Sequence, residues 1–97
     1  MITLRADDEP ARSTQLSLLV VDDDEGFRES LVAALRAQGF AVTAVDSCEE
    51  ARASLEERAY DALLVDRKLP DGDGIELLHD RPRRDDTEFI VITGNFT

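Results

Sequence analysis

Two short apolar runs in this sequence each end in acidic residues. Residues 18–21 are followed by acids at 22–25, and residues 62–65 are followed by Asp66. Uninterrupted apolar runs of this length, bounded by turn-forming residues, are typical of buried strands in a parallel sheet. In open α/β sheets, ligands bind just outside the carboxyl ends of the strands. The pattern therefore predicts an acidic site, in which Asp66 is a candidate nucleophile or metal ligand.

Several carboxylates at one edge of a sheet repel one another. At an effective dielectric near 20, a pair of carboxylates 4 Å apart costs about 4 kcal/mol, so a cation is expected to compensate. An all-oxygen site that retains water molecules suits Mg²⁺. The alternative for the acids at 22–25 is that they only begin a helix, where negative charge favours the positive end of the helix dipole.

The residues that follow Asp66 have the chemistry of a turn. Pro70 fixes φ, and Gly72 and Gly74 permit positive φ. The alternating acids and glycines of residues 71–74 also resemble a fragment of a calcium-binding loop. They lack its later ligand spacing and its distal glutamate, so we interpret them as a turn that leads into a helix.

The elements that must position these acids alternate along the chain. We expect strands at about 16–21, 40–45, 61–65 and 88–93, and helices at about 25–38, 47–58 and 75–79. Phe27, Leu31 and Leu35 form the apolar stripe of the first helix, and Ser47 with Glu50 has the spacing of a capping box. Alternating strands and helices predict an α/β fold with a doubly wound parallel sheet and right-handed crossovers.

Two potentially reactive side chains fall outside this pattern. Cys48 cannot form an internal disulfide and has no metal-ligand spacing around it, so we interpret it as a small helix residue. His79 is the only histidine, and we expect it to be exposed on the short third helix, whose Leu77 and Leu78 should face inward.

Three motifs, taken together, resemble the receiver domain of bacterial two-component response regulators. They are Val-Val-Asp-Asp at 20–23, Val-Asp followed by Leu-Pro-Asp-Gly-Asp-Gly within 65–74, and Ile-Val-Ile-Thr-Gly at 90–94. The resemblance covers most of the chain, from about 18 to 94. It implies a flavodoxin-like (CheY-like) receiver fold with strand order 2-1-3-4, the fifth strand and last helices being absent from this chain.

The resemblance also implies roles for individual residues. Asp66 would accept a phosphoryl group from a phosphohistidine on a sensor histidine kinase. Asp22, Asp23 and Asp66, with the backbone carbonyl of Lys68, would bind Mg²⁺, and the hydroxyl of Thr93 would contact the phosphoryl group. Such a chain is not an enzyme in the usual sense, since it catalyses at most its own phosphorylation and dephosphorylation.

The chain departs from the family pattern at its C-terminal end. The family continues with a fifth strand that carries a lysine, whereas the only lysine here is Lys68. We therefore expect a fragment of a longer protein, with an output domain or further chain beyond Thr97, or a partner that covers the exposed fourth strand, for example in a homodimer. An alternative is a receiver-like interaction module that is not phosphorylated. A small-molecule phosphatase or phosphotransferase is disfavoured, because it would need an acidic residue as general acid at position 68, where this chain has a lysine.

Composition narrows the remaining possibilities. With a net charge of −11 over 97 residues, the chain is not expected to contact nucleic acid directly. No apolar run reaches the length of a membrane span, and the first residues lack the apolar core of a signal peptide, which favours the cytoplasm. We expect a flexible leader at 1–15 and an incomplete receiver domain at 16–97. The motif after Asp66 is similar to that of regulators that control transcription.

Overall fold

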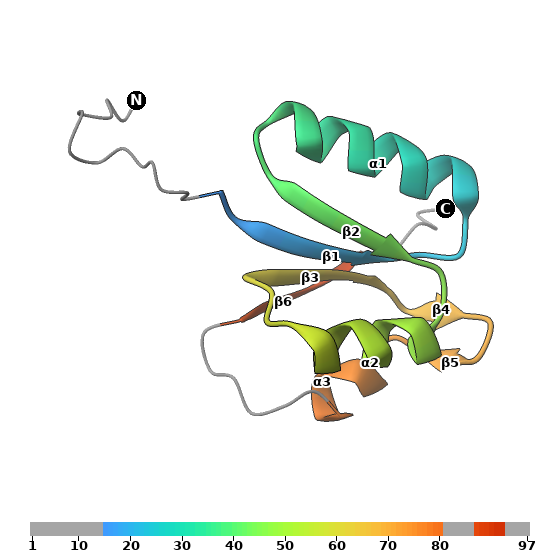
Figure 1. The fold of residues 1–97 in the computed structure, drawn as a ribbon. Helices are drawn as coiled ribbons and strands as arrows, with labels where there is room; N and C mark the ends of the chain where they lie inside the picture. The colour runs from blue at the N-terminus through green and yellow to red at the C-terminus, as the bar shows by residue number, and fades with distance from the viewer. Residues whose placement is uncertain (1–14, 81–86, 93–97) are drawn as a thin grey trace.

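A parallel four-stranded sheet forms the centre of the computed structural model, which describes residues 15–80 and 87–92. Its strands are β1 (Ser17–Val21), β2 (Ala41–Val45), β3 (Ala62–Asp66) and β6 (Glu88–Ile92), in the order β2-β1-β3-β6. Helix α1 (Glu25–Ala37) covers one face, and α2 (Cys48–Glu57) and α3 (Glu76–Asp80) cover the other (Figure 1). This arrangement confirms the predicted doubly wound fold and strand order.

The core lies on both faces of the two central strands. On the face of α2 and α3, Leu19, Leu63 and Leu77 are completely buried. On the face of α1, Val20 packs with Val32 of the helix and with a neighbouring strand. Strand β1 is buried on both faces, whereas β3 is buried on the face of α2 and partly buried on the face of α1; such strands have continuous apolar runs, as is typical of parallel sheets.

Helix α1 begins as predicted but buries a different residue. The Asp24 side chain caps it by accepting a hydrogen bond from the Phe27 N–H at 3.1 Å. Phe27, however, is 41% exposed, whereas Val32 is the buried residue of the helix. A helix turns about 100° per residue, so each step of four residues rotates about 40° past a full turn. Residues four apart therefore do not stay on one face of the helix. Leu31 and Leu35 pack against the core, whereas Phe27, at the start of the stripe, lies off the buried face.

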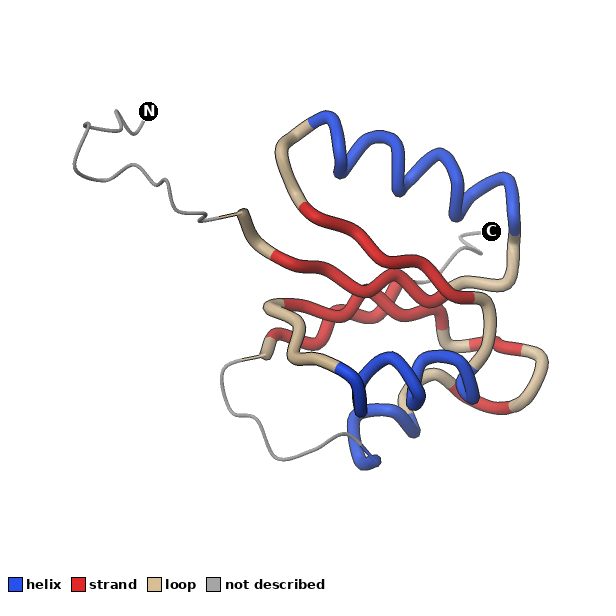
Figure 2. The backbone as a smooth tube through the Cα atoms, viewed as in Figure 1, coloured by secondary structure: helices blue, strands red, loops and turns tan. Residues whose placement is uncertain are grey.

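The segment after β3 is more ordered than a simple turn. Strands β4 (Lys68–Leu69) and β5 (Gly72–Asp73) pair in an antiparallel arrangement. We call residues 68–73 the hairpin. Figure 2 shows it beside the start of α2. In the five-residue α3, Leu77 is completely buried but Leu78 is 39% exposed, which corrects the expectation that both leucines face inward. His79 is exposed, as predicted.

Strand β6 lies at the edge of the sheet and is poorly covered. Ile90 and Val91, on opposite faces, are 47% and 38% exposed, which agrees with the expectation of an exposed fourth strand. The proposed leader lies outside the described residues, apart from Gln15. No helix in the described part of the chain is long and apolar enough to cross a membrane.

Candidate metal and phosphoryl site

Three carboxylates meet at the carboxyl ends of β1 and β3. Asp22 and Asp23 follow β1 directly, and Asp66 is the last residue of β3. One oxygen of each carboxylate lies within 4.8 Å of the others. The parallel pairing of β1 with β3 places both strand ends at the same edge, so the structure brings together the three acids that the sequence singled out. Their roles in binding and chemistry stay predictions.

Asp22 is the buried member of this cluster, with 3% of its surface exposed. Burial, followed by the charge of Asp66, raises the pKa of its carboxyl; the N–H of Asp24, which donates to Oδ1 at 2.9 Å, acts in the opposite direction. The backbone around Asp22 is held firmly, because its N–H donates to the Val45 carbonyl and its carbonyl accepts from Nη1 of Arg28 at 2.8 Å. A cation at this position would relieve the electrostatic cost of the buried charge.

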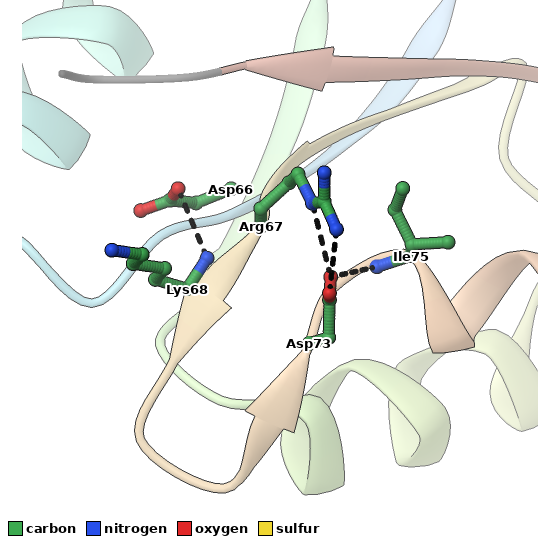
Figure 3. A network of polar contacts seen from close by, with 5 residues as sticks. All are labelled: Asp66, Arg67, Lys68, Asp73 and Ile75. Atoms are coloured by element: carbon green, nitrogen blue, oxygen red, sulfur yellow. Dashed lines mark hydrogen bonds and ion pairs between the residues drawn. The ribbon is translucent and has the colours of Figure 1, made fainter.

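Asp66 is half-buried and is oriented by the chain that follows it. Its Oδ1 accepts a hydrogen bond from the Lys68 N–H at 3.3 Å (Figure 3). The chain returns at Gly74, whose N–H donates to the Arg67 carbonyl at 2.8 Å. A Cβ on Gly74 would overlap the Asp66 carbonyl oxygen and Cγ1 of Val65. Gly74 is therefore needed for close backbone approach rather than for positive φ, whereas Gly72 does have positive φ, at 155°.

An ion pair that the sequence did not predict spans the base of the hairpin. Nη2 of Arg67 lies 2.9 Å from Oδ2 of Asp73, and Oδ1 of Asp73 accepts from the Ile75 N–H at 3.0 Å. The bond from Arg67 lowers the pKa of Asp73. Figure 3 shows the Arg67 guanidinium directed toward Asp73 and away from Asp66. The nearest basic residue in sequence thus stabilises the hairpin and is not directed at the acidic cluster.

A second unpredicted contact joins the hairpin to α2. The Asp71 carboxylate accepts hydrogen bonds from the N–H groups of Cys48 and Glu49, at 2.8 and 2.9 Å. The predicted cap is also present, since Ser47 Oγ accepts from the Glu50 N–H at 3.2 Å. Local spacing reveals the Ser47 cap, but nothing local links Asp71 to a helix more than twenty residues earlier.

Two further predicted positions lie away from the cluster or outside the described residues. Thr93 is outside the described residues; β6 ends at Ile92, which pairs in register with Asp66. Cys48 is completely buried at the start of α2, as expected for a small helix residue.

Comparison with known proteins identifies the family. The model of the response regulator receiver domain matches residues 18–97. The chain belongs to this family. Its sequence is 43% identical over 79 residues to the acid tolerance regulatory protein ActR of Rhizobium meliloti, covering 80% of this chain and 41% of ActR. It is 38% identical to the photosynthetic apparatus regulatory protein RegA of Cereibacter sphaeroides, covering 80% of this chain and 43% of RegA.

Solved receiver structures share the fold. A CheY-like receiver domain from Methanospirillum hungatei superposes with a TM-score of 0.79 at 30% identity, covering 87% of this chain and 68% of that one. One from Methylobacillus flagellatus gives 0.77 at 27% identity, covering 84% and 72%. The chain spans about two fifths of the length of ActR and RegA. It thus corresponds to the receiver part of regulators that are longer.

Proposed function

We propose that this receiver domain accepts a phosphoryl group on Asp66 in a Mg²⁺-dependent reaction, with a phosphohistidine of a sensor histidine kinase as the donor. The observation that carries the proposal is the convergence of three carboxylates within 4.8 Å of one another, in a chain of the receiver family. Aspartate is an established covalent acceptor of phosphoryl groups in proteins.

The residues of the cluster fit a magnesium ion. Their donor set consists of carboxylate oxygens, which hard divalent cations prefer, and Asp22 is a buried charge whose neighbours are also acidic. Asp22, Asp23 and Asp66, together with the proposed carbonyl of Lys68, would hold the ion. Bound there, Mg²⁺ neutralises charge on the transferred group and so permits an anionic phosphoryl group to approach.

The chemistry assigned to the chain is a single displacement. A carboxylate oxygen of Asp66 forms a bond to phosphorus while the bond to the donor nitrogen breaks, and its electron pair leaves with the imidazole. Lys68 supports the geometry by donating its N–H to the Asp66 carboxylate. Thr93 is the proposed hydroxyl partner of the phosphoryl group. In this role the chain is a phosphoacceptor rather than an enzyme that acts on other substrates.

The wider signalling role follows the same proposal. ActR and RegA are regulatory proteins, and AruR of Pseudomonas aeruginosa, which is 38% identical to this chain over 82 residues, is a transcriptional regulatory protein; these relatives support an output domain that controls transcription. The net charge of −11 supports leaving contact with nucleic acid to that output domain. The exposed side chains of β6 support pairing with a second copy along this edge. The proposed location is the cytoplasm.

The test is intact-mass spectrometry after incubation with Mg²⁺ and acetyl phosphate, a small-molecule phosphoryl donor. We expect a phosphoryl adduct on the wild-type chain and none on Asp66→Asn. Binding of beryllium trifluoride offers a second assay, since the MaeR response regulator has been solved bound to it. Absence of an adduct on a folded chain that binds Mg²⁺ would contradict the proposed phosphoryl transfer, and equal adducts on both proteins would contradict Asp66 as the acceptor.

A further inference from the structure

The tip of the hairpin is attached to the start of α2 by the carboxylate of Asp71. Its two oxygens accept from the N–H groups of Cys48 and Glu49, the first two residues of the helix. The first N–H groups of a helix have no carbonyl partner within the helix, and the helix dipole favours a negative charge at this end. The bonds also hold the pKa of Asp71 below its ordinary value. Asp71 thus links two segments that are distant in sequence.

The same hairpin covers the thiol of Cys48. Cys48 is completely buried, and it shares a core cluster with Leu69 of β4, which is 8% exposed. On the other strand of the hairpin, a Cβ placed on Gly72 would lie 3.7 Å from Cys48 Sγ. Opening of the hairpin would therefore expose a thiol that is otherwise shielded from solvent.

The base of the hairpin adjoins the phosphoryl site. Lys68, its first residue, donates its N–H to Oδ1 of Asp66, and the chain re-enters beside Asp66 through Gly74. A segment fixed at its tip by Asp71 and at its base by Asp66 has little freedom to rotate. The orientation of the Lys68 peptide therefore depends on contacts at both ends.

We call the hairpin docked when Asp71 accepts the hydrogen bonds from Cys48 and Glu49. We infer that Asp71 is a positioning residue, which strengthens Mg²⁺ binding by holding the hairpin in this docked arrangement. The inference rests on the proposed function, since it concerns the same metal site. If only the docked state presents the full ligand set, then the apparent affinity falls with the docked fraction. Linkage is reciprocal, so Mg²⁺ in turn stabilises docking and protects Cys48.

The experiment compares four variants of the 97-residue chain. Asp71→Ala removes the two backbone bonds to α2 and the side-chain bond with Cys48, and Asp71→Asn retains an oxygen acceptor without the charge. Ser47→Ala is the control for weaker capping of α2, because it removes the bond to Glu50 N–H but leaves the hairpin contact. Glu49→Gln is the control for charge. It removes a neighbouring carboxylate, but the backbone N–H of residue 49 can still donate to Asp71.

Two quantities are measured for each protein. Calorimetric titration with Mg²⁺ gives the dissociation constant, and reaction of Cys48 with a soluble aromatic disulfide gives the rate of thiol exposure. Labelling is recorded at several low urea concentrations, where a rate that does not depend on urea identifies local opening rather than global unfolding.

Without metal, we expect Cys48 of Asp71→Ala to be labelled about tenfold faster than in wild type, because hydrogen bonds to a charged group are lost. We expect the same variant to bind Mg²⁺ about threefold more weakly. Asp71→Asn should fall between it and wild type, and both controls should bind Mg²⁺ like wild type. Saturating Mg²⁺ should slow labelling of the wild-type chain. Equal Mg²⁺ affinity in wild type and Asp71→Ala would overturn this inference alone. Failure of wild type to bind Mg²⁺ would overturn the proposed function, and the inference with it.

Discussion

Strands β1 and β3 lie inside the sheet, whereas β6 lies at its edge, and the two regions are buried to very different degrees. Leu19, Val20 and Val21 of β1 and Leu63 and Val65 of β3 are at most 1% exposed, while Ile90 and Val91 of β6 are 47% and 38% exposed. The three carboxylates of the site are all attached to the interior strands. The comparison indicates that the proposed metal site rests on the best-packed part of the chain, independently of how β6 is covered.

The largest effect is expected from truncating the interior strand. Leu63→Ala removes a completely buried side chain of β3 and should lower the free energy of unfolding by about 3 kcal/mol. Ile90→Ala on β6 should cost less than about 1 kcal/mol, because Ile90 is already 47% exposed. Urea unfolding followed by circular dichroism measures both.

Equal losses from the two substitutions would contradict the contrast between the strands. A large loss from Ile90→Ala would mean that β6 is covered in solution, for example by a second copy of the chain. Sedimentation at several protein concentrations would then distinguish a dimer from a monomer.

The next largest effect concerns the turn beneath Asp66. Gly74→Ala would force a Cβ into the Asp66 carbonyl oxygen and Val65, and should lower stability by about 2 kcal/mol, as overpacking in a close-packed interior does. Gly26→Ala is the matched control, because its Cβ would meet only Asp24 Oδ1 at 3.6 Å. Since alanine is favoured over glycine in a helix, this control should be neutral or stabilising by up to about 1 kcal/mol.

Urea unfolding of both glycine variants tests that prediction, and Mg²⁺ titration of Gly74→Ala extends it. Unchanged stability of Gly74→Ala would show that the backbone beneath Asp66 can shift, contrary to the close approach of Gly74 to the Asp66 carbonyl oxygen.

A smaller effect of opposite sign is expected within the acidic cluster. Asp66→Asn removes one of the charges that raise the pKa of Asp22, so it should stabilise the metal-free chain by about 0.5–1 kcal/mol at neutral pH. The folded chain binds a proton on Asp22 more tightly than the unfolded chain does. Charging Asp22 therefore opposes folding, and this part of the stability is lost as pH rises through the raised pKa.

Thermal unfolding in a chelating buffer, across the acidic range, measures this effect. Asp66→Asn should show a weaker loss of stability above the Asp22 pKa, and saturating Mg²⁺ should remove most of the difference by stabilising wild type. A lower melting temperature for Asp66→Asn without metal would contradict repulsion within the cluster.

Sequence reasoning succeeded where the determinants are local or strictly periodic. The apolar runs before Asp22 and Asp66 predicted the interior strands, and the strand ends predicted which acids converge. It was wrong about Phe27, because a four-residue repeat does not follow the pitch of a helix. It missed the bonds from Asp71 to α2 and the ion pair of Arg67 with Asp73, because these depend on how the hairpin folds back in three dimensions.

The smallest expected effect is a pH dependence at the hairpin. The N–H of Cys48 lowers the pKa of the Asp71 carboxyl, so the folded chain favours its charged form. A carboxyl with a depressed pKa contributes stability above its unfolded value, and this contribution is lost as pH falls through the lower folded value. Urea unfolding of wild type and Asp71→Asn should therefore differ at neutral pH and converge in acid. Ser47 has no titrating side chain, so the difference between wild type and Ser47→Ala should stay constant over the same range. A gap between wild type and Asp71→Asn that persists in acid would mean that geometry rather than charge sustains the contact between the hairpin and α2.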